Sequence, residues 1–354
     1  MKGRGNRRGT LKEVATRAGV SVAAVSKVLN GRGDNVRIAT LTADRIREAA
    51  KDLNYVPNAL ARSLRMQQNH TIGLVFENFG AISEGPLFYV HMLDGIAAQL
   101  FSRGYRLTII PEINHDDPIS TVGDGRLDGI VWCKMPTSPD IVKALSRSPV
   151  PFVALHARPL EALASTVFVC CDNAGGIDLA IEHLVELGHK SLLFVMEEGE
   201  TAVPDAMERL EAFRKGCTAR DLDHRVTIWH HDLREFPAFA KNLPRETGVI
   251  CWNEYIATEF ISKARQIGLQ IPQQLSVIGF DSTPYSATTN PPLTAVRQPI
   301  RAMASQAAAT LIDLVEGRPV SRNDLVFPCT LDVRASTGPV PSTRPKTSTQ
   351  RIPS

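Results

Sequence analysis

Two helix-start signals and one helix-stop signal lie within residues 10–30, and they leave little freedom in how this segment folds. Thr10 and Glu13 have the spacing of a capping box, in which a hydroxyl and a carboxylate satisfy free amides of the first helical turn. Gly19 can supply the left-handed backbone that ends a helix, and Ser21 can cap the next one. Apolar residues recur at helical spacing in both halves: Leu11, Val14, Ala15, Ala18, Val25, Val28 and Leu29. The segment therefore predicts two short helices joined by a tight turn.

A third helix is predicted over residues 41–53, with Ile46, Ala49, Ala50 and Leu53 facing inward. Thr40 is expected to be its N-cap. Together the three helices make a helix-turn-helix head over residues 10–57. The outer face of its second helix carries mainly short side chains, so a DNA major groove could approach closely. The alternative is an ordinary small helical hairpin with a basic surface.

Charge is distributed unevenly along the chain. Residues 1–65 contain 14 Lys and Arg against 5 Asp and Glu, whereas the remainder contains 26 against 32. Residues 1–9 are rich in Gly and Arg and are expected to be disordered. A basic head attached to an acidic body is typical of a phosphate-binding module joined to a different domain.

Residues 71–338 alternate short apolar runs with amphipathic helical segments. Such alternation predicts an α/β core of two doubly wound parallel-sheet subdomains, in which ligands bind at the carboxyl ends of strands between the lobes. About eight core strands are expected, at residues 71–76, 107–110, 129–132, 151–155, 167–170, 191–195, 248–252 and 275–280. Residues 339–354 are rich in Pro, Ser and Thr and are expected to form a disordered tail.

Several classes of protein are disfavoured. The six cysteines lack metal-like or paired spacing, which favours reduced thiols, and no signal peptide or membrane-spanning run is recognisable. No GxGxxG, P-loop or GxSxG motif is present, so an enzyme is not expected. The polar clusters 115–117 and 230–232 could bind a metal, but solvated loops are the better interpretation. We therefore expect no catalytic residues, no metal site and no cofactor.

The head motif resembles that of the lactose-repressor (LacI/GalR-type) family of bacterial transcription regulators, and the resemblance extends over residues 10–338. Beyond the head it rests on residues 151–158, 172–173, 181–189, 272–281, 291–298 and 333–337. It implies a core similar to periplasmic sugar-binding proteins. It also implies a sequence-specific DNA-binding regulator, most often a repressor, which a small molecule controls allosterically.

The resemblance assigns DNA-contacting roles within the head. Val22, Ala23 and Lys27 align with base-reading positions, although Lys27 could contact only phosphate. Ser21, Ser26 and Asn30 fit phosphate ligands, and the helix start at Thr10 and Leu11 could meet another phosphate. Tyr55 is also assigned to the DNA-binding set.

Residues 58–65 fit the family's hinge helix. This segment is short enough to be unstable alone, and in the family two copies pair over the minor groove. Asn58 begins this segment and is assigned to the DNA-binding set, Ala61 matches a small groove-facing position, and Leu64 matches a leucine that kinks the DNA by wedging into a base step. The alternative is a linker helix packed on the core.

Six residues are expected at the effector site: Phe76, Phe88, Arg158, Arg209, Asn253 and Asp281. Arg158 and Arg209 match the family's cleft arginines. Asp281 and Asn253 each follow a predicted strand, where a carboxylate and an amide can bind sugar hydroxyls. For Phe76 and Phe88, packing in the core is an equally good interpretation.

The resulting expectation is a cytoplasmic, nucleoid-associated bacterial homodimer that binds a palindromic operator in double-stranded DNA. Its effector would be a carbohydrate or derivative, and no membrane contact is expected. The dimer should form through the core lobes, with a helix around residues 90–100 as one candidate, while a tetramer through another core surface stays open. The competing hypothesis is a sugar-binding transport component, which the basic head and the missing signal peptide disfavour.

Overall fold

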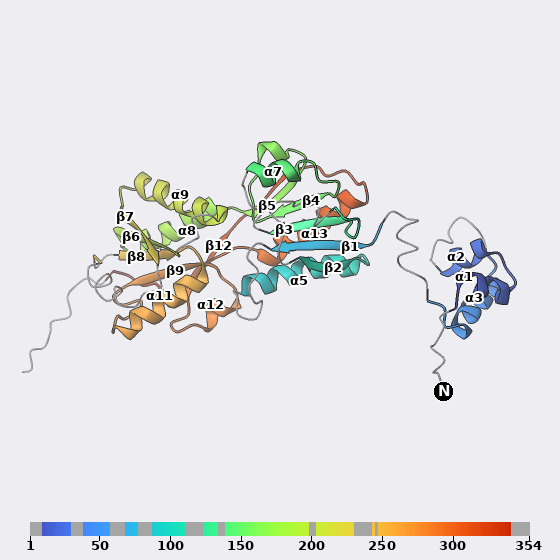
Figure 1. Cartoon of the computed structure of the whole chain (residues 1–354). Helices are drawn as coiled ribbons and strands as arrows, with labels where there is room; N and C mark the ends of the chain where they lie inside the picture. Colours follow the sequence, from blue (N-terminus) through green and yellow to red (C-terminus); the bar gives the residue numbers. More distant parts are fainter. Residues whose placement is uncertain are drawn as a thin grey trace, which may run out of the picture. The chain divides into compact units, whose positions relative to one another are not determined.

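The structure is a computed structural model, and it describes residues 9–29, 38–56, 68–76, 87–110, 123–133, 139–197, 203–229, 243–244 and 247–340. The chain divides into two compact units, residues 1–69 and 70–354. Figure 1 shows the first as a small helical head and the second as an α/β core.

The head contains three helices packed around one apolar cluster. They are α1 (Leu11–Ala18), α2 (Val22–Leu29) and α3 (Thr40–Asp52). Val14, Val25 and Ile46 are fully buried at its centre, one from each helix. Gly19 has φ +65° at the end of α1, and the Ser21 hydroxyl accepts a 3.2 Å hydrogen bond from the Ala24 amide at the start of α2. The predicted turn and caps are confirmed.

The predicted cap of the third helix is wrong. α3 begins at Thr40, so its N-cap is Ala39, whose side chain makes no capping hydrogen bond. The Ala39 carbonyl instead accepts the amides of Thr42 and Ala43 at 2.8 and 3.1 Å. Alanine cannot accept a hydrogen bond through its side chain, so this helix starts without the stabilisation that α1 and α2 receive.

The core contains two six-stranded sheets, as its predicted fold class requires. The first has the order β11-β5-β4-β3-β1-β2, and all its pairings are parallel. Its strands are β1 (Thr71–Phe76), β2 (Arg106–Ile110), β3 (Gly129–Cys133), β4 (Phe152–Leu155), β5 (Val167–Cys171) and β11 (Asp324–Phe327). On one face lie α5 (Leu87–Ser102) and α13 (Ile300–Val315), and α7 (Pro139–Leu145) lies on the other (Figure 1). A short 3-10 helix, Glu161–Leu163, contacts α7.

The second sheet has the order β12-β10-β9-β8-β6-β7, and only its β10–β12 pairing is antiparallel. Its strands are β6 (Ser191–Glu197), β7 (Asp223–Trp229), β8 (Thr247–Cys251), β9 (Ser276–Asp281), β10 (Thr294–Arg297) and β12 (Thr330–Asp332). Its helices are α8 (Asn173–Glu186), α9 (Pro204–Ala219), α11 (Glu254–Gln266) and α12 (Pro284–Thr288). In Figure 1, α8 and α9 lie on one side of this sheet and α11 on the other. Both sheets are therefore doubly wound.

The chain passes between the lobes three times, after β5, after β10 and after β11. The first lobe consequently combines β1–β5 with α13 and β11 from near the C-terminus.

The eight predicted core strands are present, whereas β7, β10, β11 and β12 were not predicted as strands. The last three of these have four residues or fewer, so a search for apolar runs does not detect them.

The expected tail boundary is also slightly wrong. Val340, which was predicted to lie in the disordered tail, donates a 3.0 Å hydrogen bond from its amide to the carbonyl of Leu187 and so still belongs to the core.

All six cysteines are free, and five of them are buried. Among the described helices, none combines the length and apolar character that crossing a bilayer demands.

Candidate functional site

The head presents the predicted recognition face of α2 to its surface. Ser21, Val22, Ala23 and Lys27 are accessible there, and the apolar Val22 side chain is 43% exposed. Ser26 is half-buried. An apolar side chain left outside a small helical core is available for contact with a thymine methyl group. The predicted base-reading role requires this face to be accessible, and it is.

The start of α1 is occupied by its own capping box. The Thr10 amide donates to Glu13 Oε2 at 2.7 Å, and the Glu13 amide donates to Thr10 Oγ1 at 3.3 Å. A phosphate at this helix start would have to replace or neighbour the Glu13 carboxylate. Leu11 and Tyr55 are half-buried against the head core. The predicted residues Asn30, Asn58, Ala61 and Leu64, with the whole hinge segment 58–65, lie outside the described residues.

In the core, most of the predicted effector residues meet between the two lobes. A small cavity there is lined from the first lobe by Phe88 and Tyr89 of α5. The second lobe supplies Asp205, Arg209, Trp252, Asn253, Asp281 and Gln298. Asp281 is the last residue of β9, and Asn253 lies two positions after the end of β8, so both lie near strand ends as predicted. The open space among these residues is about 30 Å³, which is enough for one water molecule.

Arg209 is the central cation of this cleft. Its side chain is 2% exposed, Nε donates to Asn173 Oδ1 at 2.8 Å, and Nη1 donates to the Trp252 carbonyl at 2.6 Å. The guanidinium also lies 3.6 Å from the centre of the Phe280 ring and 3.6 Å from Asp281 Oδ1. A buried charge needs such compensation, so these contacts fix the orientation of the guanidinium.

Asp281 lies at the end of β9 in a strained backbone conformation. Its φ is +86°, and the next residue, Ser282, has φ +46°. Non-glycine residues rarely adopt positive φ, and they do so mostly where a site requires it. The Asp281 carboxylate accepts a 2.5 Å hydrogen bond from the side-chain amide of Gln298. Gln298 is 3% exposed and its Oε1 makes no hydrogen bond, so it is a site residue that the sequence patterns did not reveal.

Asn253 also caps a helix. It is the N-cap of α11, and its Oδ1 accepts a 2.8 Å hydrogen bond from the Ile256 amide. The side chain lines the cavity while its carbonyl oxygen is committed to the helix. Only its amide group is therefore left to donate to a ligand.

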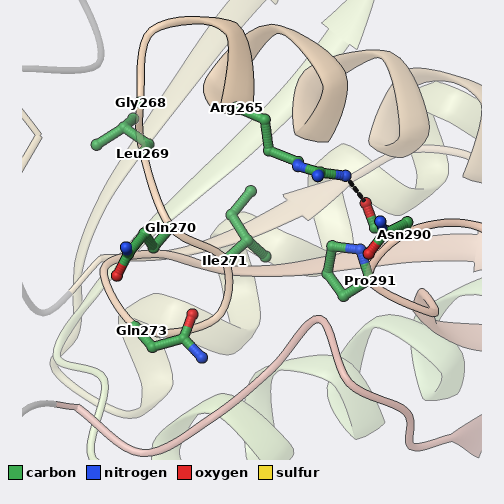
Figure 2. A pocket seen from close by; sticks show the side chains of 8 residues that line it. All are labelled: Arg265, Gly268, Leu269, Gln270, Ile271, Gln273, Asn290 and Pro291. Carbon is green, nitrogen blue, oxygen red and sulfur yellow. Dashed lines mark hydrogen bonds between the residues drawn. The ribbon is translucent and has the colours of Figure 1, made fainter.

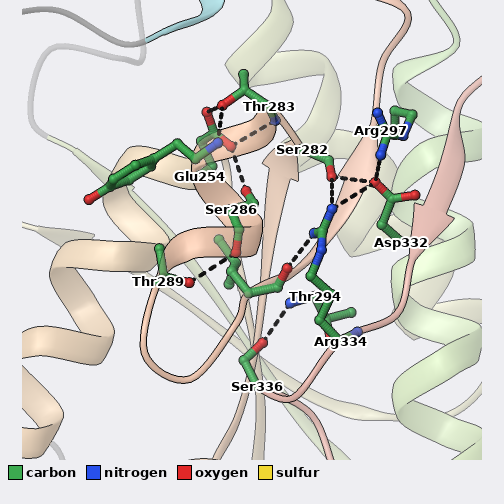
Figure 3. A network of polar contacts seen from close by, with 12 residues as sticks. Glu254, Ser282, Thr283, Ser286, Thr289, Thr294, Arg297, Asp332, Arg334 and Ser336 are labelled. Carbon is green, nitrogen blue, oxygen red and sulfur yellow. Dashed lines mark hydrogen bonds and ion pairs between the residues drawn. The ribbon is translucent and has the colours of Figure 1, made fainter.

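Two polar networks hold the turn that follows Asp281 (Figure 3). Glu254 is 2% exposed and accepts hydrogen bonds from the Thr283 amide, the Thr283 hydroxyl and the Ser286 hydroxyl, at 2.9, 2.5 and 2.5 Å. Burial raises the pKa of Glu254 in spite of these donors. On the other side of the turn, Asp332 accepts from the Ser282 hydroxyl at 2.5 Å and pairs with Arg297 and Arg334. The strained turn is thus fixed from both sides.

The two predicted phenylalanines differ. Phe88 lines the cavity and lies 4.7 Å, centre to centre, from the His156 ring. Phe76 is 1% exposed and contributes to the apolar core, where its ring contacts Tyr89 edge-on. For Phe76 the packing interpretation is therefore the one that the structure supports.

Arg158 does not line the cavity, in contrast to its expected role. Its Nε donates to Glu208 Oε1 at 2.8 Å, and a second nitrogen, Nη2, contacts the same oxygen. Two residues earlier, His156 is 1% exposed, and its Nδ1 lies 3.5 Å from Asp205 Oδ2. His156 and Arg158 follow β4 of the first lobe, whereas Asp205 and Glu208 belong to α9 of the second.

These contacts join into one chain of polar side chains. The second Glu208 oxygen accepts from Asn173 Nδ2 at 2.7 Å, and Asn173 also donates to Asp205 at 3.1 Å. Asn173 accepts from Arg209, which faces Asp281, and Asp281 accepts from Gln298. This series of polar contacts runs from Arg158 in one lobe through the cleft to Gln298 in the segment before α13. The spacing of residues in the sequence could not predict this series of contacts, since it joins residues that lie far apart in sequence.

A second pocket, of about 570 Å³, lies elsewhere in the second lobe (Figure 2). Its lining includes Arg265, whose Nη1 donates to the Asn290 carbonyl at 2.7 Å, and residues that precede β9. It is therefore at the opposite end of β9 from Asp281. No predicted site residue lies there.

No group of three or more potential metal ligands occurs within the part of the chain that the structure describes. The polar clusters 115–117 and 230–232 lie outside that part.

Comparisons with known proteins match both units. The model of bacterial regulatory proteins of the lacI family matches residues 10–58, and that of a periplasmic binding protein-like domain matches residues 181–337. The HTH-type transcriptional regulator reg1 of Streptomyces lividans is 30% identical over 355 residues, which cover 94% of this chain and 98% of reg1. The head and the core thus occur together in this relative.

Two solved structures are similar over nearly the whole chain. A complex of the transcriptional regulator CelR with cellobiose has a TM-score of 0.67 and 25% identity, and the match covers 93% of this chain and 100% of that one. The lac repressor dimer bound to operator and the anti-inducer ONPF has a TM-score of 0.78 and 21% identity, with coverage of 94% and 100%. The architecture of head and two-lobed core is therefore shared with one protein bound to cellobiose and with another bound to operator DNA and an anti-inducer.

Proposed function

Because the chain belongs to the lacI family of bacterial regulatory proteins, we propose that this DNA-binding transcriptional regulator is a repressor controlled by a carbohydrate. The carbohydrate binds in the cleft between the lobes and shifts the affinity of the head for its operator. Such control requires that the ligand bind one conformation of the core more tightly than the other. No catalytic turnover is expected.

The observation that carries the proposal is the buried pair of Arg209 and Asp281 at the carboxyl ends of the second sheet. Arg209 donates hydrogen bonds, Asp281 accepts them, and the Asn253 amide adds another donor beside them. Phe88 and Trp252 supply aromatic surface in the same cavity. Alternating donors and acceptors beside aromatic rings suit a sugar, which has hydroxyls at its edges and C–H groups on its faces. Cellobiose, the ligand in the similar CelR complex, is the first probe to test.

On the DNA side, Val22, Ala23 and Lys27 are proposed to read bases, with Ser21, Ser26 and Asn30 on phosphates. The exposure of Val22 and Lys27 on one helix supports this assignment. Asn58, Ala61 and Leu64 are proposed to form the minor-groove hinge. A symmetric operator requires two heads, so the acting species is proposed to be a homodimer.

The dimer surface is proposed to lie on the core. Leu87 and Val90 of α5 are 39% and 41% exposed, and Tyr285 of α12 is 43% exposed. Apolar side chains that stay accessible on a folded core favour contact with another copy.

The test is a thermal-shift screen of carbohydrates, purines and sugar phosphates on the full chain, followed by selection of bound DNA fragments with and without the hit. We expect a neutral sugar to raise the melting temperature and to change the recovery of a palindromic sequence. A ligand that stabilises the core without any effect on DNA recovery would contradict the proposal, as would the conversion of that ligand to a product.

A further inference from the structure

The lobes are joined across the cleft by charged side chains of the protein itself. Arg158 in the first lobe holds Glu208 in the second, with 36% of the arginine side chain and 26% of the glutamate side chain exposed. Beside this ion pair, the fully buried His156 faces Asp205 at 3.5 Å. Both contacts connect the segment after β4 to the first turns of α9, so they can form only while these two segments are together.

Glu208 also reaches the candidate effector site. Through Asn173 it is linked to Arg209, with donor–acceptor distances of 2.7 and 2.8 Å. Separation of Arg158 from Glu208 would therefore release one anchor of the network that orients the central guanidinium. The ion pair between the lobes, Arg158 with Glu208, is therefore connected through Asn173 to the hydrogen bond of Arg209 within the site.

The cavity at Arg209 is too small for a sugar, although a larger hollow of about 670 Å³, which Asp281 and Gln298 also line, lies between α5 and the turn after β9. The cavity at Arg209 has about 30 Å³, whereas even a monosaccharide has a dozen heavy atoms and needs several times that volume. A ligand can fill the cavity at Arg209 and Asn253 only if the lobes or their side chains move apart. The ion pair opposes that movement because its two charges lie on opposite sides of the cleft.

We propose that Arg158 and Glu208 form a latch that holds the lobes together in the absence of a ligand and lowers the affinity of the cleft for its effector. The two residues are positioning residues that act through the lobes and Asn173, and they need not touch the ligand. When the binding-competent state is only partly populated, the observed dissociation constant rises by the inverse of that population. The consequence for effector binding rests on the proposed function, while the latch itself does not.

The test compares ligand-free Arg158→Gln and Glu208→Gln with the wild-type full chain. Spin labels on genetically encoded residues at Lys143 of α7 and Lys215 of α9 report the distance between the lobes by pulsed electron resonance. Both variants should give a longer and broader distance distribution than wild type. The double variant should match the single ones, because each substitution breaks the same contact.

Arg103→Gln is the matched control. Arg103 is paired with Asp313 inside the first lobe at 3.0 Å, and its side chain has the same 36% exposure as that of Arg158. Its loss should leave the distance distribution unchanged. A wild-type distribution for Arg158→Gln would overturn the latch.

Calorimetric titration with cellobiose and ribose supplies the second readout. If either sugar binds, Arg158→Gln should bind it about fivefold more tightly than wild type, and Arg103→Gln should not. Weaker binding by Arg158→Gln would overturn the claim that the latch opposes the ligand. If neither sugar binds wild type, the distances still decide the latch, and the missing affinity counts against the proposed carbohydrate effector alone.

Discussion

The side-chain amide of Gln298 donates a 2.5 Å hydrogen bond to Oδ1 of Asp281, and this contact joins the end of β9 to the segment that leads into α13. β9 belongs to the second lobe, whereas α13 packs on the first. A ligand that binds Asp281 therefore either replaces this hydrogen bond or adds to it. The hydrogen bond lies at one of the three points where the polypeptide crosses between the lobes.

Asp281→Asn should remove the sugar-induced thermal shift while the fold is largely retained. Asparagine tolerates positive φ and keeps an oxygen that can accept from Gln298, but it loses the charge that faces Arg209. Asp281→Ala should lose the shift and also cost about 1–3 kcal/mol of unfolding free energy, because buried donors are left without an acceptor. Thermal unfolding with and without the hit checks both, and a full shift in Asp281→Asn would exclude Asp281 from the site.

Glu254→Gln should change how stability depends on pH. Burial raises the folded-state pKa of Glu254 above its ordinary value of 4.5. The contribution of this group to stability is therefore fully present below pH 4.5 and is lost as the pH rises through the folded pKa. The unfolding free energy of wild type relative to Glu254→Gln should fall as the pH is raised from about 4 to about 8.

Urea unfolding over this range provides the measurement. Glu182→Gln, on the exposed side of α8, controls for the removal of a charge. It should leave the pH dependence as it is in wild type. A difference between wild type and Glu254→Gln that stays constant with pH would show that Glu254 titrates alike in the folded and unfolded chains.

Ile46→Ala should unfold the head and spare the core. Ile46 is fully buried in α3, and truncation of such a side chain costs about 2–5 kcal/mol, which a unit this small cannot absorb. Calorimetry of the full chain should show loss of the head transition, and operator binding should disappear while sugar binding persists. Leu41→Ala, at a position 82% exposed in the same helix, should have neither effect.

Lys27→Ala should relax the preference for one base pair, with a loss of about 1–3 kcal/mol in discrimination at that position. The expectation follows from a single long donor on a face of otherwise short side chains. Sequencing of DNA selected by wild type and variant gives the answer. Equal weakening on every sequence would instead assign Lys27 to a phosphate.

The full chain and a chain ending at Val340 should both sediment as dimers, because the proposed contact lies on α5 and α12 and not in the tail. Val90→Asp, which places a charge on the exposed side of α5, should shift the equilibrium toward monomer. A tetramer that disappears on truncation would contradict this arrangement.

Local sequence patterns predicted the parts of the structure that depend on a few neighbouring residues. The capping box at Thr10, the stop at Gly19 and the eight apolar runs each correspond to an element of the structure. The errors at Thr40 and Val340 concern element ends, where one hydrogen bond decides the boundary. Arg209 and Asp281 were found because the family motif and the strand ends mark them.

The contacts of the cleft were beyond the reach of sequence patterns. Gln298 follows a four-residue strand that was not predicted because it contains no long apolar run. Its hydrogen-bond partner Asp281 is 17 positions away. Arg158 was assigned to the effector site because it matches a cleft arginine of the family, and its position gives no sign of its partner Glu208, which lies 50 positions further along the chain and in the other lobe. Whether a cleft arginine meets a ligand or a carboxylate depends on how the lobes pack, and spacing carries no information about that.

The interleaved order of the lobes has a consequence for synthesis on the ribosome. β1–β5 and α5 emerge first, but α13, which covers the same face of their sheet as α5, is made only after the whole second sheet except β12. At about 5–20 residues per second, the roughly 130 residues between β5 and α13 take about 6–26 s to appear. During that interval the nascent first lobe exposes the apolar surface that α13 later buries. A holding chaperone that binds such surface should therefore associate with the growing chain in this window and leave once α13 has emerged.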